Sequence, residues 1–486
     1  MRSPKKVFQF TLSDQQYNRL LRYLGHLTFL ALGILSLVYY RERMLHFDSA
    51  SYAFNMIYRG EFNTGHNRYI SYLPQILALG VRNWGGSLQA VLMTYSASFI
   101  LLHYLIFCTI VYGFKNPKGG LLLALACTLT VRYKFYAPVG EVMLGIPFVV
   151  LIIAWLMSDR YQAAGRRGLK IGFGVLCSGF LLITHPFPMV TLGLTWLIWM
   201  VYSQRWRIAF EWILPLACLL MWAVKLGSQG MGTSYEAGRI NQLLEAQKVL
   251  TNLNDYYVWG RLGWYLDVHY LLPMILFMGG LIYLIVQKKY WTTLLSIVAF
   301  TVITAMTIVL FSYLGGPIYV LLDGYLAHLG VIMALVFVLS IGHRREWWLA
   351  GVFVFLLMFS VDRIKGTHHF FTQREDLLLA ILDGQLESEE HKLVTSMDAF
   401  DWERLWLPWA IGIETLMMST LETPDHPKTL YFYENKANID QLLEDPDLFL
   451  ALQYFFNPYE VAQLPVQFKS KLPKGKYKEV DLKGRY

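Results

Sequence analysis

Charged side chains are scarce in this 486-residue chain: they make up 16% of it, whereas 55% of the residues are hydrophobic. Soluble globular domains have about 25% charged residues, so this composition excludes an ordinary soluble enzyme. Residues 1–361 hold 28 basic and 13 acidic side chains, whereas residues 362–486 hold 14 and 21. The net charge of +8 is therefore unevenly distributed, and we expect the two parts to lie in different surroundings.

Cysteine and the common catalytic motifs are also lacking. The four cysteines, Cys108, Cys127, Cys177 and Cys218, all fall in apolar segments without Cys-x-x-Cys spacing, which implies neither a disulfide framework nor a zinc site. No Gly-x-x-x-x-Gly-Lys-Ser/Thr loop, His-Glu-x-x-His or Gly-x-Ser-x-Gly is present. Nucleotide-driven transport and serine or zinc hydrolysis therefore have no support.

Long apolar runs are what the sequence does contain. About 20 residues at 1.5 Å each cross the hydrocarbon of a bilayer, and the pattern predicts about eleven spans. They lie near residues 24–40, 88–112, 119–133, 142–158, 169–184, 187–202, 208–226, 270–287, 291–312, 322–341 and 346–361. The polar segment before the first run has no small-residue cleavage site after it, so we expect the first helix to remain as an anchor.

The positions of the basic residues predict the orientation. Lys and Arg concentrate in the short loops near residues 115–118, 160–170, 205–207, 288–289 and 344–345. The positive-inside rule assigns these loops to the cytoplasm and gives no reason to expect a nucleic-acid partner. We therefore predict a multi-pass protein of a cell membrane, bacterial inner or plasma membrane, whose active face is extracytoplasmic.

The predicted fold class is an all-α polytopic membrane domain over residues 1–361, followed by a small extracytoplasmic soluble domain over residues 362–486. Turn signals such as Asp383-Gly384 and Asn457-Pro458 alternate with periodic stretches in the second part. This mixture is typical of a folded domain, for which α/β and helical structures both stay open.

The first external loop, residues 41–87, contains a predicted helix. Ala50, Ala53, Phe54 and Ile57 recur at helical spacing on one side. A helix of this kind is too short to span the bilayer and lies at its interface. Asp48 precedes this pattern, and two interpretations are compatible: it caps the helix, with Phe47 as the staple residue before it, or it is the catalytic base.

Few other acids share the predicted outer face, so a general base must come from a short list that includes Asp48 or from a histidine. Arg132, Lys134 and Glu141 form a turn whose two cations suit a phosphate, although snorkelling cations at a plain interfacial turn give the same pattern. The remaining candidates for substrate binding are His46, His66, Arg68 and His185. For His185, beside two prolines, an ordinary hydrogen-bonded turn residue is the alternative.

This layout resembles the GT-C superfamily of polytopic glycosyltransferases that use polyprenyl-phosphate-linked sugars. The resemblance is carried by Asp48 in Phe47-Asp48-Ser49-Ala50-Ser51-Tyr52 directly after the first span, by interface helices in the same loop, and by an outward soluble domain. The turn at Glu141 resembles a second charged external turn of the family. Many members have two adjacent acids where this chain has Asp48-Ser49, so Asp48 is expected to act alone.

The resemblance implies that Asp48 deprotonates an acceptor hydroxyl, which attacks the anomeric carbon of the lipid-linked sugar with inversion. Arg68, Arg132 or Lys134 would meet the charge of the leaving phosphate. The expected partners are a polyprenyl-phosphate-linked sugar donor, a glycan, lipid or protein acceptor, and membrane lipid. We expect no metal site and no fixed cofactor, with a divalent metal ion as an open alternative.

Two other functions remain alternatives. A transporter or flippase for lipid-linked glycans would carry ionisable residues within its spans and paired halves, and neither is evident here. A glycan polymerase or ligase of another membrane fold would carry a pair of arginines in a late external loop, where this chain has Arg239 and Arg261.

Overall fold

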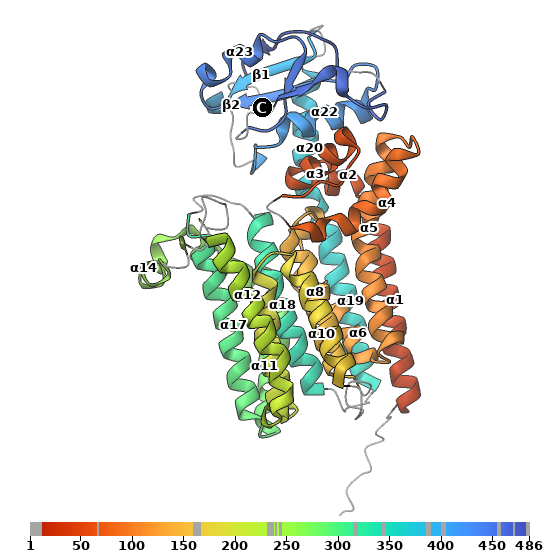
Figure 1. The fold of residues 1–486 in the computed structure, drawn as a ribbon, viewed down its shortest axis with the longest axis vertical. Helices are drawn as coiled ribbons and strands as arrows, with labels where there is room; N and C mark the ends of the chain where they lie inside the picture. Colours follow the sequence, from red (N-terminus) through yellow and green to blue (C-terminus); the bar gives the residue numbers. More distant parts are fainter. Residues whose placement is uncertain are drawn as a thin grey trace, which may run out of the picture.

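A computed structural model describes residues 12–65, 68–158, 167–230, 238, 241–242, 245–313, 319–341, 347–384, 390–399, 405–453, 458–469 and 472–482. Helix accounts for 74% of the structure, and strands are few. Long helices lie side by side in a bundle, and a smaller mixed domain covers one end of it (Figure 1). We call this the domain-facing end of the bundle.

Within the described parts of the chain, four helices are long and apolar enough to cross a membrane. They are α1 (Asp14–Val38), α5 (Leu88–Cys108, continued by a π-turn to Gly113), α17 (Tyr290–Leu310) and α18 (Tyr319–Ile341). The helical segments Tyr257–His269 and Leu271–Val286 count as a fifth span if this pair, bent by 82°, is taken as one. These helices define a membrane protein, whereas the predicted count of eleven spans is not established by them.

Shorter apolar helices complete the bundle. They are α6 (Pro117–Ala126), α8 (Glu141–Leu156), α10 (Arg167–Leu182), α11 (Phe187–Tyr202), α12 (Ile213–Gly230) and α16 (Leu271–Val286). The central helix α18 is apolar all round and buried along almost its whole length, as expected of a helix in the middle of a bundle. By contrast, α1 exposes Leu27, Leu30 and Ile34 on one side, which is a surface suited to lipid.

Three helices lie between the bundle and the C-terminal domain: α2 (Tyr40–Met44), α3 (Phe47–Arg59) and α4 (Tyr72–Asn83) (Figure 1). The predicted apolar side of α3 is buried, including Ala50 and Ile57. Its polar side is covered too, because the Tyr459 hydroxyl of the C-terminal domain donates to Asn55 Oδ1 at 2.8 Å. Most of α3 is thus enclosed by protein, with Arg59 exposed at its end.

The C-terminal domain is α/β. The helix α19 (Trp347–Gly366) runs past the predicted boundary at residue 361, and α20 (His368–Asp383) leads into the domain. A parallel sheet of order β2-β1-β5 joins β2 (Thr429–Tyr433), β1 (Lys392–Ser396) and β5 (Lys478–Glu479). The helix α22 (Ile411–Glu422) connects β1 to β2 and contacts both β2 and α3. Strands β3 (Leu448–Leu450) and β4 (Pro458–Glu460) form an antiparallel pair.

Candidate active site

Asp48 is the second residue of α3 and does not cap it. The N-cap is His46, which makes no side-chain capping bond. Phe47 has a φ of 52°, and its N–H donates to Glu414 Oε1 of α22 at 2.6 Å. The prediction that Asp48 is the cap is therefore wrong. The first free amide of the helix is satisfied by a carboxylate from the C-terminal domain, which leaves the Asp48 carboxylate available.

Glu414 belongs to a buried charge network that the sequence analysis missed. Its carboxylate pairs with Arg374 of α20 at 2.5 Å, and the two side chains are 0% and 1% exposed. Arg374 also lies 2.8 Å from His46 Nδ1. The pKa of His46 lies well below its usual value, mainly because the ring is buried and also because the positive charge of Arg374 is close. His46 is fully buried, so its predicted contact with substrate has no support in this geometry.

The Asp48 carboxylate is partly exposed and has no hydrogen-bond or ion-pair partner among the residues that the structure describes. Burial raises its pKa to about 6; Lys134 and Arg68 oppose this rise, and Glu141 adds to it. A carboxylate with this pKa is ionised at pH 7 and basic enough to accept a proton. We call Asp48, Arg68, Lys134 and Glu141 the Asp48 cluster.

Glu141 is held by two partners from the first loop. Its Oε2 accepts from Arg68 Nη1 at 3.0 Å, and its Oε1 accepts from the Tyr52 hydroxyl at 2.8 Å. The Gly65 N–H donates to the same hydroxyl. Glu141 therefore positions Arg68.

Lys134 lies in the short helix α7 (Tyr133–Tyr136) and has no carboxylate within ion-pair distance in the described part of the chain. Its Nζ donates to the Val139 carbonyl at 3.3 Å. A Cβ on Gly140 would lie 2.5 Å from this Nζ, so the glycine makes room for the ammonium group. Burial lowers the pKa of Lys134. The lysine is a buried cation beside Asp48. A bound phosphate requires such a positive charge.

The turn around Lys134 is fixed from the core by Asp323 of α18. Asp323 Oδ2 accepts the N–H groups of Arg132 at 2.9 Å and Lys134 at 2.8 Å. The Tyr270 hydroxyl donates to Oδ1 at 3.1 Å. Asp323 is thus the buried acceptor that shapes this turn.

The other predicted residues lie away from the Asp48 cluster. Arg132 turns to the opposite side, where its Nε donates to Thr367 Oγ1 at 2.8 Å. His185 is a bonded turn residue: its Nδ1 accepts the Phe187 N–H, and its Nε2 lies 3.1 Å from the Tyr325 hydroxyl. His66 lies outside the described residues.

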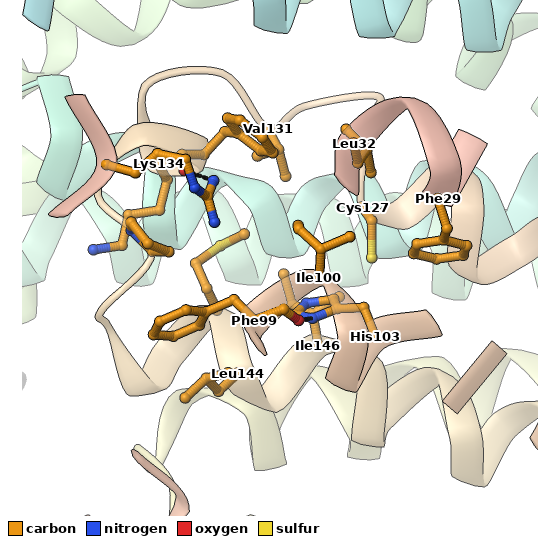
Figure 2. Close-up of a pocket in the computed structure, with 14 residues that line it drawn as sticks. Phe29, Leu32, Phe99, Ile100, His103, Cys127, Val131, Lys134, Leu144 and Ile146 are labelled. Carbon is orange, nitrogen blue, oxygen red and sulfur yellow. Dashed lines mark hydrogen bonds between the residues drawn. The ribbon is translucent and has the colours of Figure 1, made fainter. Parts of the chain in front are cut away.

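An apolar cavity reaches the turn from inside the bundle. It holds about 50 Å³, space for one or two water molecules, and is lined by side chains such as Phe29, Phe99 and Ile146 (Figure 2). Lys134 lies along one side of it, with its ammonium group directed away from the apolar side chains (Figure 2). The Lys134 ammonium group therefore does not serve a ligand inside the cavity.

Searches against protein-family models, curated protein sequences and solved structures gave no match for the chain. Among the described residues, no group of three or more His, Cys, Asp or Glu side chains could hold a metal ion. The Asp48 cluster combines a carboxylate that can accept a proton with two cations that can bind an anion.

Proposed function

We propose that the protein is an inverting glycosyltransferase of GT-C type, with about eleven membrane spans. It moves a sugar from a polyprenyl-phosphate-linked donor to a hydroxyl of a glycan, lipid or protein acceptor. The observation that supports this best is Asp48, a partly exposed carboxylate with a pKa of about 6 and the cations Lys134 and Arg68 nearby.

The proposed chemistry is a single displacement. Asp48 takes the proton of the acceptor hydroxyl while that oxygen bonds to the anomeric carbon. The bond from this carbon to the phosphate oxygen breaks, and its electron pair leaves with the lipid phosphate. Lys134 supplies a point charge to the leaving phosphate, and Arg68 supplies N–H donors in a planar fork. Attack from the side opposite the leaving group inverts the anomeric carbon.

We place the domain-facing end of the bundle on the extracytoplasmic side of a cell membrane. Support comes from the charge pattern, because basic pairs such as Arg205/Arg207 and Lys288/Lys289 follow the ends of α11 and α16. These ends lie away from the C-terminal domain (Figure 1). Basic residues in short loops mark the cytoplasmic side.

The test is Asp48→Asn in proteoliposomes supplied with a panel of polyprenyl-phosphate hexoses and pentoses. Removal of a general base lowers the rate by about 10²–10⁴-fold, and we expect a loss in this range. Asp255→Asn is the matched control and should retain activity, because it alters an exposed acid of the second long loop, residues 227–269. Full activity of folded Asp48→Asn protein would overturn the proposal. Transbilayer movement of the lipid without transfer in wild-type protein would favour a flippase.

A further inference from the structure

Two arginines at the domain-facing end are fixed in place on the side of α7 away from the Asp48 cluster. Arg132 lies with its guanidinium carbon 5.0 Å from the centre of the Tyr133 ring. Arg261 lies 5.3 Å from the Tyr319 ring centre and 5.5 Å from that of Trp264. These ring contacts hold both guanidinium groups in defined positions.

Neither arginine has a carboxylate within ion-pair distance among the described residues. Arg132 Nε donates to Thr367 Oγ1, and its Nη1 contacts the His269 ring. Arg261 Nε donates to the Tyr257 hydroxyl at 2.5 Å. Asp323, the buried acid of this region, is already occupied by two backbone N–H groups and the Tyr270 hydroxyl. The two guanidinium charges are partly exposed and uncompensated within the described part of the chain, which favours an anionic ligand.

The rings around the arginines come from four separate parts of the chain. Tyr133 and Tyr319 stack with their centres 5.3 Å apart. Trp406, from the C-terminal domain, lies edge-on to both, at 6.2 and 5.9 Å. Trp264 comes from the second long loop and lies 5.9 Å from Tyr319. Binding sites commonly lie where domains meet and combine rings with a few fixed polar groups.

This ring cluster continues to the start of α3. Trp406, which has a φ of 62°, stacks on Phe47, which has a φ of 52°, with their ring centres 6.4 Å apart. Both are positive φ values at bulky residues, a strained conformation that clusters at functional sites. Phe47 directly precedes Asp48 in the chain, so the ring cluster extends to the residue before the proposed base.

We propose that Arg132 and Arg261, with the rings of Trp264, Tyr319 and Trp406, bind the acceptor, and that this acceptor carries an anionic sugar group, phosphate or carboxylate. Guanidinium forks bind such groups through paired hydrogen bonds, and aromatic rings pack on the C–H faces of sugars. The turn at residues 132–134 then presents Lys134 to the donor and Arg132 to the acceptor. This assignment rests on the proposed glycosyl transfer.

The experiment measures binding without turnover. Full-length protein in phosphatidylcholine nanodiscs is titrated with glucose 6-phosphate, whose phosphate is not on the anomeric carbon as it is in the donor, and followed by saturation-transfer NMR, with glucose and inorganic phosphate in parallel. We expect glucose 6-phosphate to bind most tightly. Arg132→Gln and Arg261→Gln should each weaken binding about tenfold or more, because each removes hydrogen bonds to a charged group. Lys134→Met, which changes the donor side of the turn, should weaken binding less than either arginine substitution.

A matched control is Arg207→Gln. Arg207 also lies over an indole ring, that of Trp206 at 5.2 Å, but at the opposite end of the bundle, and its substitution should leave binding unchanged. Thermal unfolding of each variant verifies that it is folded. A second measurement is the rate of sugar transfer. Arg261→Gln should raise KM for the acceptor and leave KM for the donor unchanged.

Three results would overturn the inference. The first is no saturation transfer to wild-type protein at millimolar probe. The second is binding that survives both arginine substitutions but is lost in Lys134→Met, which would place the probe in the donor site. The third is binding abolished by phosphatidylglycerol in the nanodisc, which would identify a lipid headgroup as the occupant. Loss of transfer in Asp48→Asn tests the proposed function separately, because probe binding does not depend on that carboxylate.

Discussion

Replacing Asp48 by Asn should stabilise the protein at the same time as it abolishes the proposed reaction. Burial raises the pKa of Asp48 from 3.8 to about 6, so ionising this group is less favourable in the folded state than in the unfolded state. Each pKa unit corresponds to 1.36 kcal/mol, which sets an upper bound of about 3 kcal/mol for the penalty at pH 8. Because the side chain is partly exposed, we expect about 1–2 kcal/mol after solvent screening.

A second effect opposes the first. Asp48 lies in the first turn of α3, where a negative charge gains about 0.3–1 kcal/mol from the helix dipole. Asn loses this gain, so the net stabilisation of Asp48→Asn at pH 8 should be about 1 kcal/mol. Asp14 provides the matched control, since it lies in the first turn of α1 and is exposed. Asp14→Asn loses the dipole gain without relief of a burial penalty and should be slightly destabilised.

The assay is thermal unfolding of wild-type and variant proteins in one detergent, repeated from pH 8 to pH 4. A raised native pKa means that wild-type stability is lost as the pH rises through about 6. The advantage of Asp48→Asn should therefore be largest above pH 7 and shrink toward pH 4, where Asp48 is protonated in the folded state and close to half protonated in the unfolded state. An Asp48→Asn protein that is less stable than wild type at pH 8 would refute the burial argument.

Three further predictions address the site and its support. The rate of sugar transfer should fall about tenfold per pH unit below pH 6, as the proposed base Asp48 becomes protonated; a rate that is flat down to pH 5 would contradict its role. Glu414→Gln leaves the buried Arg374 charge without its partner and should destabilise the protein by about 3–5 kcal/mol, with faster hydrogen exchange at Phe47. The double variant that adds Arg374→Met should lose less, and an equal or larger loss would show that the ion pair is not the cause. Gly412→Ala places a Cβ 2.3 Å from the Leu450 carbonyl oxygen and should cost about 1–3 kcal/mol in thermal unfolding, whereas Gly475→Ala, with open space around it, should be neutral.

The local parts of the fold could be predicted from the sequence because they depend on residues close together in the chain. The helical spacing of Ala50, Ala53, Phe54 and Ile57 predicted α3, and all four side chains are buried. The number of spans could not be settled in this way. Apolar runs show which segments avoid water, but α6 has only 10 residues and is shorter than the run that predicted it.

The parts of the site that were missed depend on contacts between distant residues. The partner of Glu141 is Arg68, 73 positions earlier in the chain, and nothing in the local pattern distinguishes it from Lys134. Glu414 lies 367 positions after Phe47. Its signal in the sequence is a single acid within the apolar run from Ile411 to Met418, which indicates a buried charge with a partner but does not identify that partner.

The bond between Glu414 and the Phe47 N–H also links the assembly of the site to the order of synthesis. The ribosome makes α3 early, but the carboxylate that completes its first turn follows 367 residues later. A nascent chain that ends before α22 already contains every member of the Asp48 cluster, yet it leaves this amide and the Arg374 guanidinium without their acceptor. The start of α3 is therefore completed only after Glu414 has been made, so the proposed activity should require a chain that includes α22.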